Sequence, residues 1–353
     1  MNKYVKRYCI DAMSGMAQGL FASLLIGTII KTLGQQLLRL GTNPVFQFLV
    51  DAGNFATNSS VVGAAMAVGI GFAMSVPALV LFSLAAVGSA ANITGGAGGP
   101  LAVLFIAVIA AECGRFVSKK TKVDIIVTPA ITILAGALLT VLTAKYIGTA
   151  ASSVGKFLVW TTNLHPFWMG ILVSVVVGIA LTLPISSAAI CAAFGLTGLA
   201  GGAAVAGCCA QMVGFAVLSF RENRWGGILS QGLGTSMLQM PNIVKNPKIW
   251  IPPILASAIT GPLATCLFKM EMNGAAVSSG MGTCGFVGQI GVITGWFEPS
   301  EVAISHGASA IMPDLLDWAG LVLICFVLPG ILSWAFGSIL RKAGWIKEGD
   351  LSL

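Results

Sequence analysis

The sequence predicts an all-α polytopic membrane protein with about ten transmembrane or re-entrant helical segments and glycine-rich hairpins. Three observations predict this class. Of the 353 residues, 56% are hydrophobic and only 9% are charged, whereas a soluble domain has about 25% charged residues. Several stretches contain the roughly 20 apolar residues that cross a hydrocarbon core of ~30 Å. The 44 glycines suit a helical bundle, because small residues let helix backbones approach each other in lipid.

The first half of the chain contains a series of apolar stretches. Residues 13–33 form the first predicted span. Residues 61–92 are long enough to cross twice, with a break at Pro77. The glycine cluster at residues 95–100 is a further helix breaker. The remaining predicted spans of this half, joined by a basic connector, are residues 101–116 and 124–146.

The second half alternates apolar spans with polar stretches. Residues 154–164 are predicted to form an amphipathic helix at the membrane surface. Residues 186–220 are split by glycines and are read either as a re-entrant piece and a full helix or as two crossings. Residues 221–248 form the longest polar stretch. The remaining predicted spans are residues 166–184, 251–270 and 314–339.

Residues 271–296 form the most unusual segment. They are rich in glycine and small hydroxyl residues and have almost no net charge. Irregular backbone is tolerated at membrane depth only where it is buried in protein or lines a polar cavity. Broken helices of this kind build the substrate sites of many transporters. The segment therefore predicts a hairpin beside a substrate site, and the alternative is an extracellular loop of small residues.

The distribution of lysine and arginine predicts the orientation. The two ends of the chain and the connectors at residues 115–122 and 221–248 are basic, so they are placed in the cytoplasm. Residues 297–313 contain glutamates but no lysine or arginine, so they are placed outside. No convincing cleavage site follows the basic N-terminal segment, and we expect the first span to be retained. This pattern predicts a multi-pass protein of a cell membrane with cytoplasmic termini.

Polar side chains in apolar segments are the candidates for a substrate site, because they are costly to bury in a membrane. Amide groups both donate and accept hydrogen bonds, as sugar hydroxyls do. Gln211, in the middle of a span, is equally consistent with a helix–helix contact and with sugar binding. The polar stretch 231–242 is read either as a packed loop or as backbone near the site. The predicted substrate-binding residues are Gln211, Gln231, Thr235, Gln239, Asn242, Asn273, Thr283 and Gln289.

Several other patterns have structural explanations. Glu112 and Arg115 are spaced to form an ion pair within one helix, and Asp314 and Asp317 suit a helix start. The cysteines lie mostly in apolar stretches without metal-ligand spacing, so neither a metal site nor a cofactor is predicted. The chain has no phosphate-binding loop and no hydrolase serine motif, which argues against a membrane hydrolase. The net charge of +7 lies in short connectors and does not indicate nucleic-acid binding.

Three long and peculiar runs, residues 198–227, 231–268 and 280–291, resemble the second family of EIIC-type membrane permeases of the bacterial sugar phosphotransferase system. The resemblance covers most of the chain. It implies a homodimer in the bacterial inner membrane that moves a sugar or polyol inward for phosphorylation, with re-entrant hairpins around the sugar. Some members of the family are described as membrane regulators, so a membrane sensor that binds a small ligand and an uncoupled sugar carrier remain alternative functions.

The resemblance also implies site residues and a partner. In better-known permeases, a glutamate and a histidine near the hairpins hold the sugar and help it to accept phosphate. Glu271 and His306 are the candidates for these catalytic roles. Residues 1–353 are read as a single membrane-embedded transporter domain without a soluble phosphocysteine domain. The phosphate donor is therefore expected to be a separate EIIB-type subunit.

Overall fold

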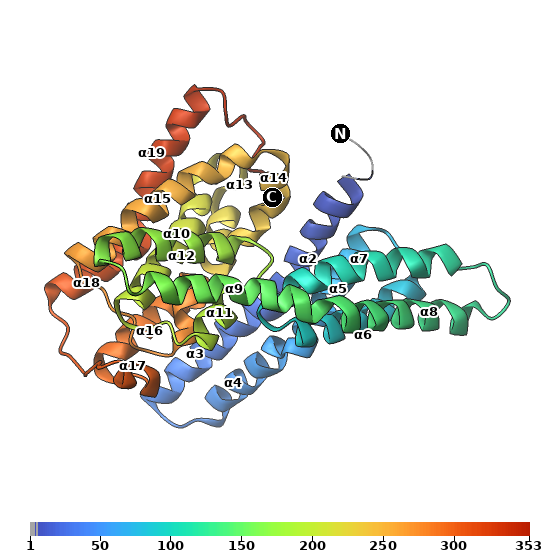
Figure 1. Ribbon diagram of the computed structural model, residues 1–353, viewed down its shortest axis with the longest axis horizontal. Coiled ribbons are helices and arrows are strands. Elements are labelled where there is room, and N and C mark those ends of the chain that lie inside the picture. The colour runs from blue at the N-terminus through green and yellow to red at the C-terminus, as the bar shows by residue number, and fades with distance from the viewer. Residues whose placement is uncertain (1–3, 5) are drawn as a thin grey trace. The chain divides into compact units, whose positions relative to one another are not determined.

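The computed structural model describes Tyr4 and residues 6–353, which form helices joined by short turns (Figure 1). Among these residues, extended pairing is limited to one isolated antiparallel bridge between Gly198 and Met272. The chain divides into two compact units, Met1–Ala151 and Ser152–Leu353. The predicted all-α class is confirmed.

Six helical segments have the length and composition of membrane spans, or seven if one pair bent by 55° at a short break is counted as a span. The multi-pass membrane class is therefore confirmed. The predicted number of about ten counted re-entrant pieces separately. The six spans are Lys6–Arg39, Ala78–Val117, Asp124–Thr161, Gly198–Leu218, Pro247–Leu267 and Leu315–Lys342; the bent pair is Pro44–Thr57 with Ser59–Ala73; two shorter apolar helical segments are Pro166–Thr182 and Cys284–Phe297.

The first unit follows the predicted breaks. The long apolar run is interrupted between α5 and α6 just before Pro77, as expected, because proline cannot continue a helix that precedes it. Gly96, with φ +51°, ends α6 in a conformation that favours glycine. The elements are η1 Lys6–Asp11, α2 Ala12–Leu20, η2 Phe21–Leu25, α3 Ile26–Leu40, α4 Pro44–Thr57, α5 Ser59–Ala73, α6 Ala78–Gly95, η3 Gly96–Gly98, α7 Gly99–Val117, α8 Asp124–Leu139, η4 Thr140–Ala144 and α9 Lys145–Thr161, whose last turns belong to the second unit.

The amphipathic helix predicted at residues 154–164 is not a separate element. Residues 124–161 form one continuous helical segment. Gly155 does not break it, because this glycine makes room for an aromatic ring: a Cβ here would lie 1.9 Å from the Phe194 side chain. The glycine serves close packing and remains helical.

The second unit is built around α12, which is buried along almost its entire length. α10 and α15 pack against it. The elements are α10 Pro166–Thr182, α11 Ser187–Ala193, α12 Gly198–Leu218, α13 Phe220–Gly227, η5 Ile228–Gly234, η6 Ser236–Gln239, α14 Met240–Lys245, η7 Pro247–Trp250, α15 Ile251–Pro262, η8 Leu263–Leu267, η9 Ala276–Gly280, η10 Cys284–Phe286, α16 Val287–Phe297, α17 Glu301–Ser305, α18 Leu315–Val322, η11 Leu323–Val327 and α19 Leu328–Lys342.

Small residues set the spacing of these helices. A Cβ on Gly207 of α12 would lie 1.8 Å from the Ser174 carbonyl oxygen of α10, so the two backbones are in direct contact. The seven residues of α11 are too few to cross a membrane. Residues 186–220 therefore contain one short helix and one helix of spanning length, which fits the first of the two predicted alternatives better than two crossings.

Candidate functional site

The hairpin at residues 271–286 lies against the glycine-rich start of α12. A Cβ on Gly202 would lie 1.8 Å from the Met270 carbonyl oxygen, so only a glycine leaves room for the hairpin backbone. The Gly198 amide donates to the Met272 carbonyl (3.1 Å), and the Met272 amide donates to the Gly198 carbonyl (3.0 Å). This bridge fixes the hairpin in register with the entry to α12.

A second re-entrant segment, around α11, packs on the tip of this hairpin. The Ser187 hydroxyl donates to the Gly280 carbonyl (2.7 Å), and the Ser279 hydroxyl donates to the Leu196 carbonyl (2.6 Å). Ser279 is completely buried, and so is Thr283. The tip of the hairpin is therefore packed inside the protein and is not a solvated loop.

A pocket of about 450 Å³ opens beside the bridge. Its polar lining includes Thr162, Thr197 and His306, and the rest is mainly apolar. Thr197 Oγ1 and His306 Nδ1 lie 3.1 Å apart, and the tautomer of the imidazole decides which of them donates. His306 is exposed, whereas Thr197 is only 8% exposed. The pocket therefore combines a fixed hydroxyl with an accessible imidazole.

The bridge brings further polar groups to the same place. In an antiparallel pair centred on Gly198 and Met272, residue 197 lies opposite residue 273. Asn273 Nδ2 donates to Glu271 Oε2 (2.8 Å), while Asn273 Oδ1 is buried without a hydrogen-bond partner. Glu271 and Asn273 flank Met272 on the hairpin side of the bridge, and the Thr197–His306 pair lies on its α12 side; we call these four residues the bridge junction. Thr197, which the sequence did not single out, completes it. The residues that line the pocket include Thr197 and His306 but not Glu271 or Asn273.

Residues 10–353 match the family model described as "Phosphotransferase system, EIIC". The chain belongs to the phosphotransferase-system EIIC family. No curated protein and no solved structure matches this EIIC chain. Membership implies a membrane permease subunit with a sugar substrate and a partner EIIB subunit.

Two predicted residues of this EIIC chain lie farther along the hairpin. Thr283 Oγ1 donates to the Gly232 carbonyl of η5. Gln289, 5% exposed, donates from Nε2 to Cys209 Sγ (3.2 Å), and its Oε1 is buried without a partner. Two unpartnered amide oxygens therefore lie in this part of the chain, Asn273 Oδ1 in the hairpin and Gln289 Oε1 just after it, at the start of α16.

Gln211 of the EIIC chain is satisfied within the bundle. Its Oε1 accepts from Trp250 Nε1 (2.8 Å) and Thr182 Oγ1 (3.2 Å), and its Nε2 donates to Ser257 Oγ (3.4 Å). These partners come from α10, η7 and α15. The observed geometry is that of a helix–helix contact.

The predicted amides of the connector form a chain with one another and with the segment at residues 345–353. Gln239 Nε2 donates to Gln231 Oε1 (2.9 Å) and to the Leu351 carbonyl (2.9 Å). Asn242 Nδ2 donates to Gln239 Oε1 (2.9 Å) and to the Ser352 carbonyl (2.8 Å). These contacts fasten residues 345–353 to the connector.

The remaining connector residues have local partners. Gln231 Nε2 donates to Ser219 Oγ (2.8 Å), and Thr235 Oγ1 accepts from the Met237 amide (3.1 Å) as the cap of η6. The sequence analysis missed the docking of residues 345–353. The sequence signal was a set of apolar residues in a polar tail, of which Ile346 and Leu351 are buried.

The bridge junction and the connector lie at opposite ends of the second unit. In Figure 1, α16 and α17 are at one end and α13 and α14 at the other. The hairpin extends between them, from Asn273 at the bridge junction to Thr283, whose hydroxyl donates to the Gly232 carbonyl of η5. Within the described residues, no group of three or more His, Cys, Asp or Glu side chains is placed to hold a metal ion.

Proposed function

We propose that this EIIC chain moves a sugar or polyol inward for phosphorylation by a separate EIIB-type subunit, and that the substrate binds first at the bridge junction. The observation that carries the proposal is the pocket of about 450 Å³ at which Thr197 and His306 meet. Its volume falls in the range of about 300–1,000 Å³ that is typical of small-molecule sites. A monosaccharide fits such a volume.

The hydrogen-bonding groups at the bridge junction that lack a partner in the protein are suited to bind sugar hydroxyls. A buried acceptor without a partner costs about 1–3 kcal/mol, and Asn273 Oδ1 is such an acceptor. A sugar hydroxyl that donates to it recovers this free energy. Hydroxyls also accept, which matches the imidazole and hydroxyl of His306 and Thr197. Gln289 Oε1 offers a second free acceptor along the hairpin.

The predicted orientation separates binding from phosphorylation. Residues 297–313, which include His306, are predicted to face outward, and the connector at residues 221–248 to face the cytoplasm. In this orientation the bridge junction is the entry side. Glu271 and His306 then bind the sugar on entry. Phosphoryl transfer takes place after translocation, on the cytoplasmic side where EIIB operates, so this proposal gives the two residues a role in sugar binding and not the catalytic role expected from the resemblance.

We further propose that both compact units belong to one membrane-embedded transporter domain, that the chain forms a homodimer, and that it lies in the bacterial inner membrane with cytoplasmic termini. The family membership supports the homodimer and the location. The basic connectors support the orientation.

Uptake by the purified chain in lipid vesicles, measured with a panel of labelled sugars and polyols, tests the function. Uptake that yields a sugar phosphate when the EIIB subunit and its phosphate donor are enclosed supports it. Uptake of the free sugar alone identifies an uncoupled carrier, and binding without uptake identifies a sensor. Ser305→Ala, which alters an exposed neighbour of His306, is the matched control for Thr197→Val and His306→Gln, both expected to weaken binding about tenfold.

A further inference from the structure

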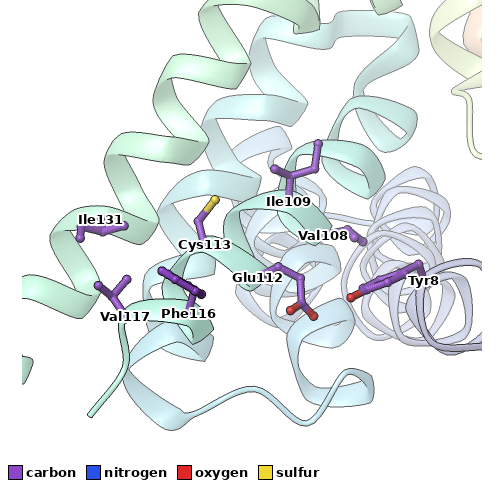
Figure 2. A pocket seen from close by; sticks show the side chains of 8 residues that line it. All are labelled: Tyr8, Val108, Ile109, Glu112, Cys113, Phe116, Val117 and Ile131. Atoms are coloured by element: carbon purple, nitrogen blue, oxygen red, sulfur yellow. The ribbon is translucent and has the colours of Figure 1, made fainter. Parts of the chain in front are cut away.

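An apolar groove of about 780 Å³ lies on the first unit, between α7, α8 and η1 (Figure 2). Ile109, Phe116 and Ile131 are among its lining residues, and Glu112 and Tyr8 provide its polar groups. Phe116 is 73% exposed and Ile109 is 47% exposed. Apolar side chains with this exposure on a membrane span face lipid. The groove cannot satisfy sugar hydroxyls along its length, so it is not a second sugar site.

Positive charge gathers at one end of this groove. Glu112 Oε1 lies 3.0 Å from Arg7 Nη2 and 3.6 Å from Arg115 Nη1. Lys120 Nζ lies 3.7 Å from the centre of the Phe116 ring, which lines the groove. Two guanidinium groups therefore flank one carboxylate, and a third cation lies over the neighbouring Phe116 ring. In Figure 2 the hydroxyl end of Tyr8 points toward that carboxylate.

The cations retain hydrogen-bonding capacity. Arg7 Nη2 is buried and, although it lies within ion-pair distance of Glu112, it makes no hydrogen bond. The Arg115 side chain is 48% exposed. Asp124 accepts from the Lys119 amide (2.7 Å) and from Thr128 Oγ1 (2.6 Å). The sequence of the first unit contains ten Lys and Arg residues and four Asp and Glu residues, so an excess of positive charge remains.

We propose that this groove binds one anionic phospholipid, with an acyl chain along α7 and its phosphate among Arg7, Arg115 and Lys120. The site lies where two spans, Ala78–Val117 and Asp124–Thr161, meet at their connector, which places the cations at the membrane surface. Basic pockets between spans recognise acidic headgroups, and guanidinium groups bind phosphate oxygens through charge-assisted hydrogen bonds. Glu112 positions the two guanidinium groups.

Native mass spectrometry of the purified full chain tests the proposal, with phosphatidylglycerol and phosphatidylcholine of identical acyl chains as the probes. We expect phosphatidylglycerol to bind more tightly. Arg115→Gln with Lys120→Gln should weaken phosphatidylglycerol binding at least about tenfold and phosphatidylcholine binding by much less, because the choline cation already compensates the phosphate charge. The matched control, Lys342→Gln with Lys347→Gln, removes the same charge from the second unit and should keep the preference.

Alkylation of Cys113, which lines the groove, locates the bound lipid. Phosphatidylglycerol should protect Cys113 from alkylation in the wild type and in the control variant. It should not protect Cys113 in the groove variant, Arg115→Gln with Lys120→Gln. Ile109→Trp, which fills the groove, should weaken binding of both lipids. Three results would overturn the proposal. The first is equal affinity of the wild type for the two lipids, and the second is a preference for phosphatidylglycerol that remains in the groove variant. The third is protection of Cys113 by self-association of the protein in the absence of lipid.

Discussion

Two buried glutamines of the second unit should differ in how much stability the same substitution costs. Gln211→Leu and Gln289→Leu both replace an amide by an apolar group of similar size. Gln211 is bonded to Trp250, Thr182 and Ser257. Gln289 makes one contact, to the sulfur of Cys209, and its Oε1 has no partner. The number of broken bonds therefore differs between the two variants.

The magnitudes follow from these partners. Gln211→Leu leaves the indole N–H of Trp250 without its acceptor at 2.8 Å. An unpaired group costs about 1–3 kcal/mol in a protein interior, and hydrogen bonds between membrane helices contribute about 0.6 kcal/mol on average with a maximum of about 1.7. We expect a loss of about 1–2 kcal/mol. Gln289→Leu removes an unpaired acceptor and a contact to sulfur, a weak acceptor, so stability should change by less than about 0.5 kcal/mol.

Thermal unfolding in a mild detergent measures the difference. A thiol-reactive dye suits the assay, because Cys191, Cys208, Cys209, Cys284 and Cys325 are buried and become reactive on unfolding. The midpoint should fall by a few degrees for Gln211→Leu and remain near the wild type for Gln289→Leu. Affinity for the sugar found in the uptake panel should fall about tenfold for Gln289→Leu. Equal destabilisation by both substitutions would refute the reasoning.

Three further predictions concern packing, charge and topology. Arg341→Gln should destabilise the chain by about 3–5 kcal/mol, because it leaves Glu222, 6% exposed and 2.8 Å from Arg341 Nη2, without its counter-charge; a midpoint equal to that of the wild type would contradict this. Gly202→Ala should displace the hairpin and abolish sugar binding in a binding assay. The control Gly226→Ala, whose Cβ would meet nothing within 4 Å, should preserve sugar binding. A cysteine that replaces Lys245 in a cysteine-depleted chain should not react with an impermeant reagent added outside intact cells. Labelling of this cysteine would show that the predicted orientation is reversed.

The sequence predicted features that depend on neighbouring residues. The break before Pro77 follows from the proline position, and the glycines before α12 predicted a division of residues 186–220 while leaving open whether the first part crosses the membrane. The aspartates of the last span behave as expected: Asp314 and Asp317 accept from each other's backbone amides and cap α18. The predicted Glu112–Arg115 pair is also present.

Long-range pairing could not be read from the sequence. The closest partner of Glu112 is Arg7, 105 positions away, and nothing local indicates this contact. The amides of Gln239 and Asn242 have the composition of a sugar site, yet in the structure they hold residues 345–353. An amide binds a backbone carbonyl as readily as a hydroxyl, so its residue type does not reveal its partner.

The most direct test of the central claim is an experimental structure with the sugar from the uptake panel bound. The account predicts sugar density in the pocket beside the Gly198–Met272 bridge, with hydroxyls within hydrogen-bond distance of Thr197, Asn273 or His306 in the outward-facing state. A sugar bound instead among Gln231, Gln239 and the connector, with the bridge junction empty in that state, would contradict it.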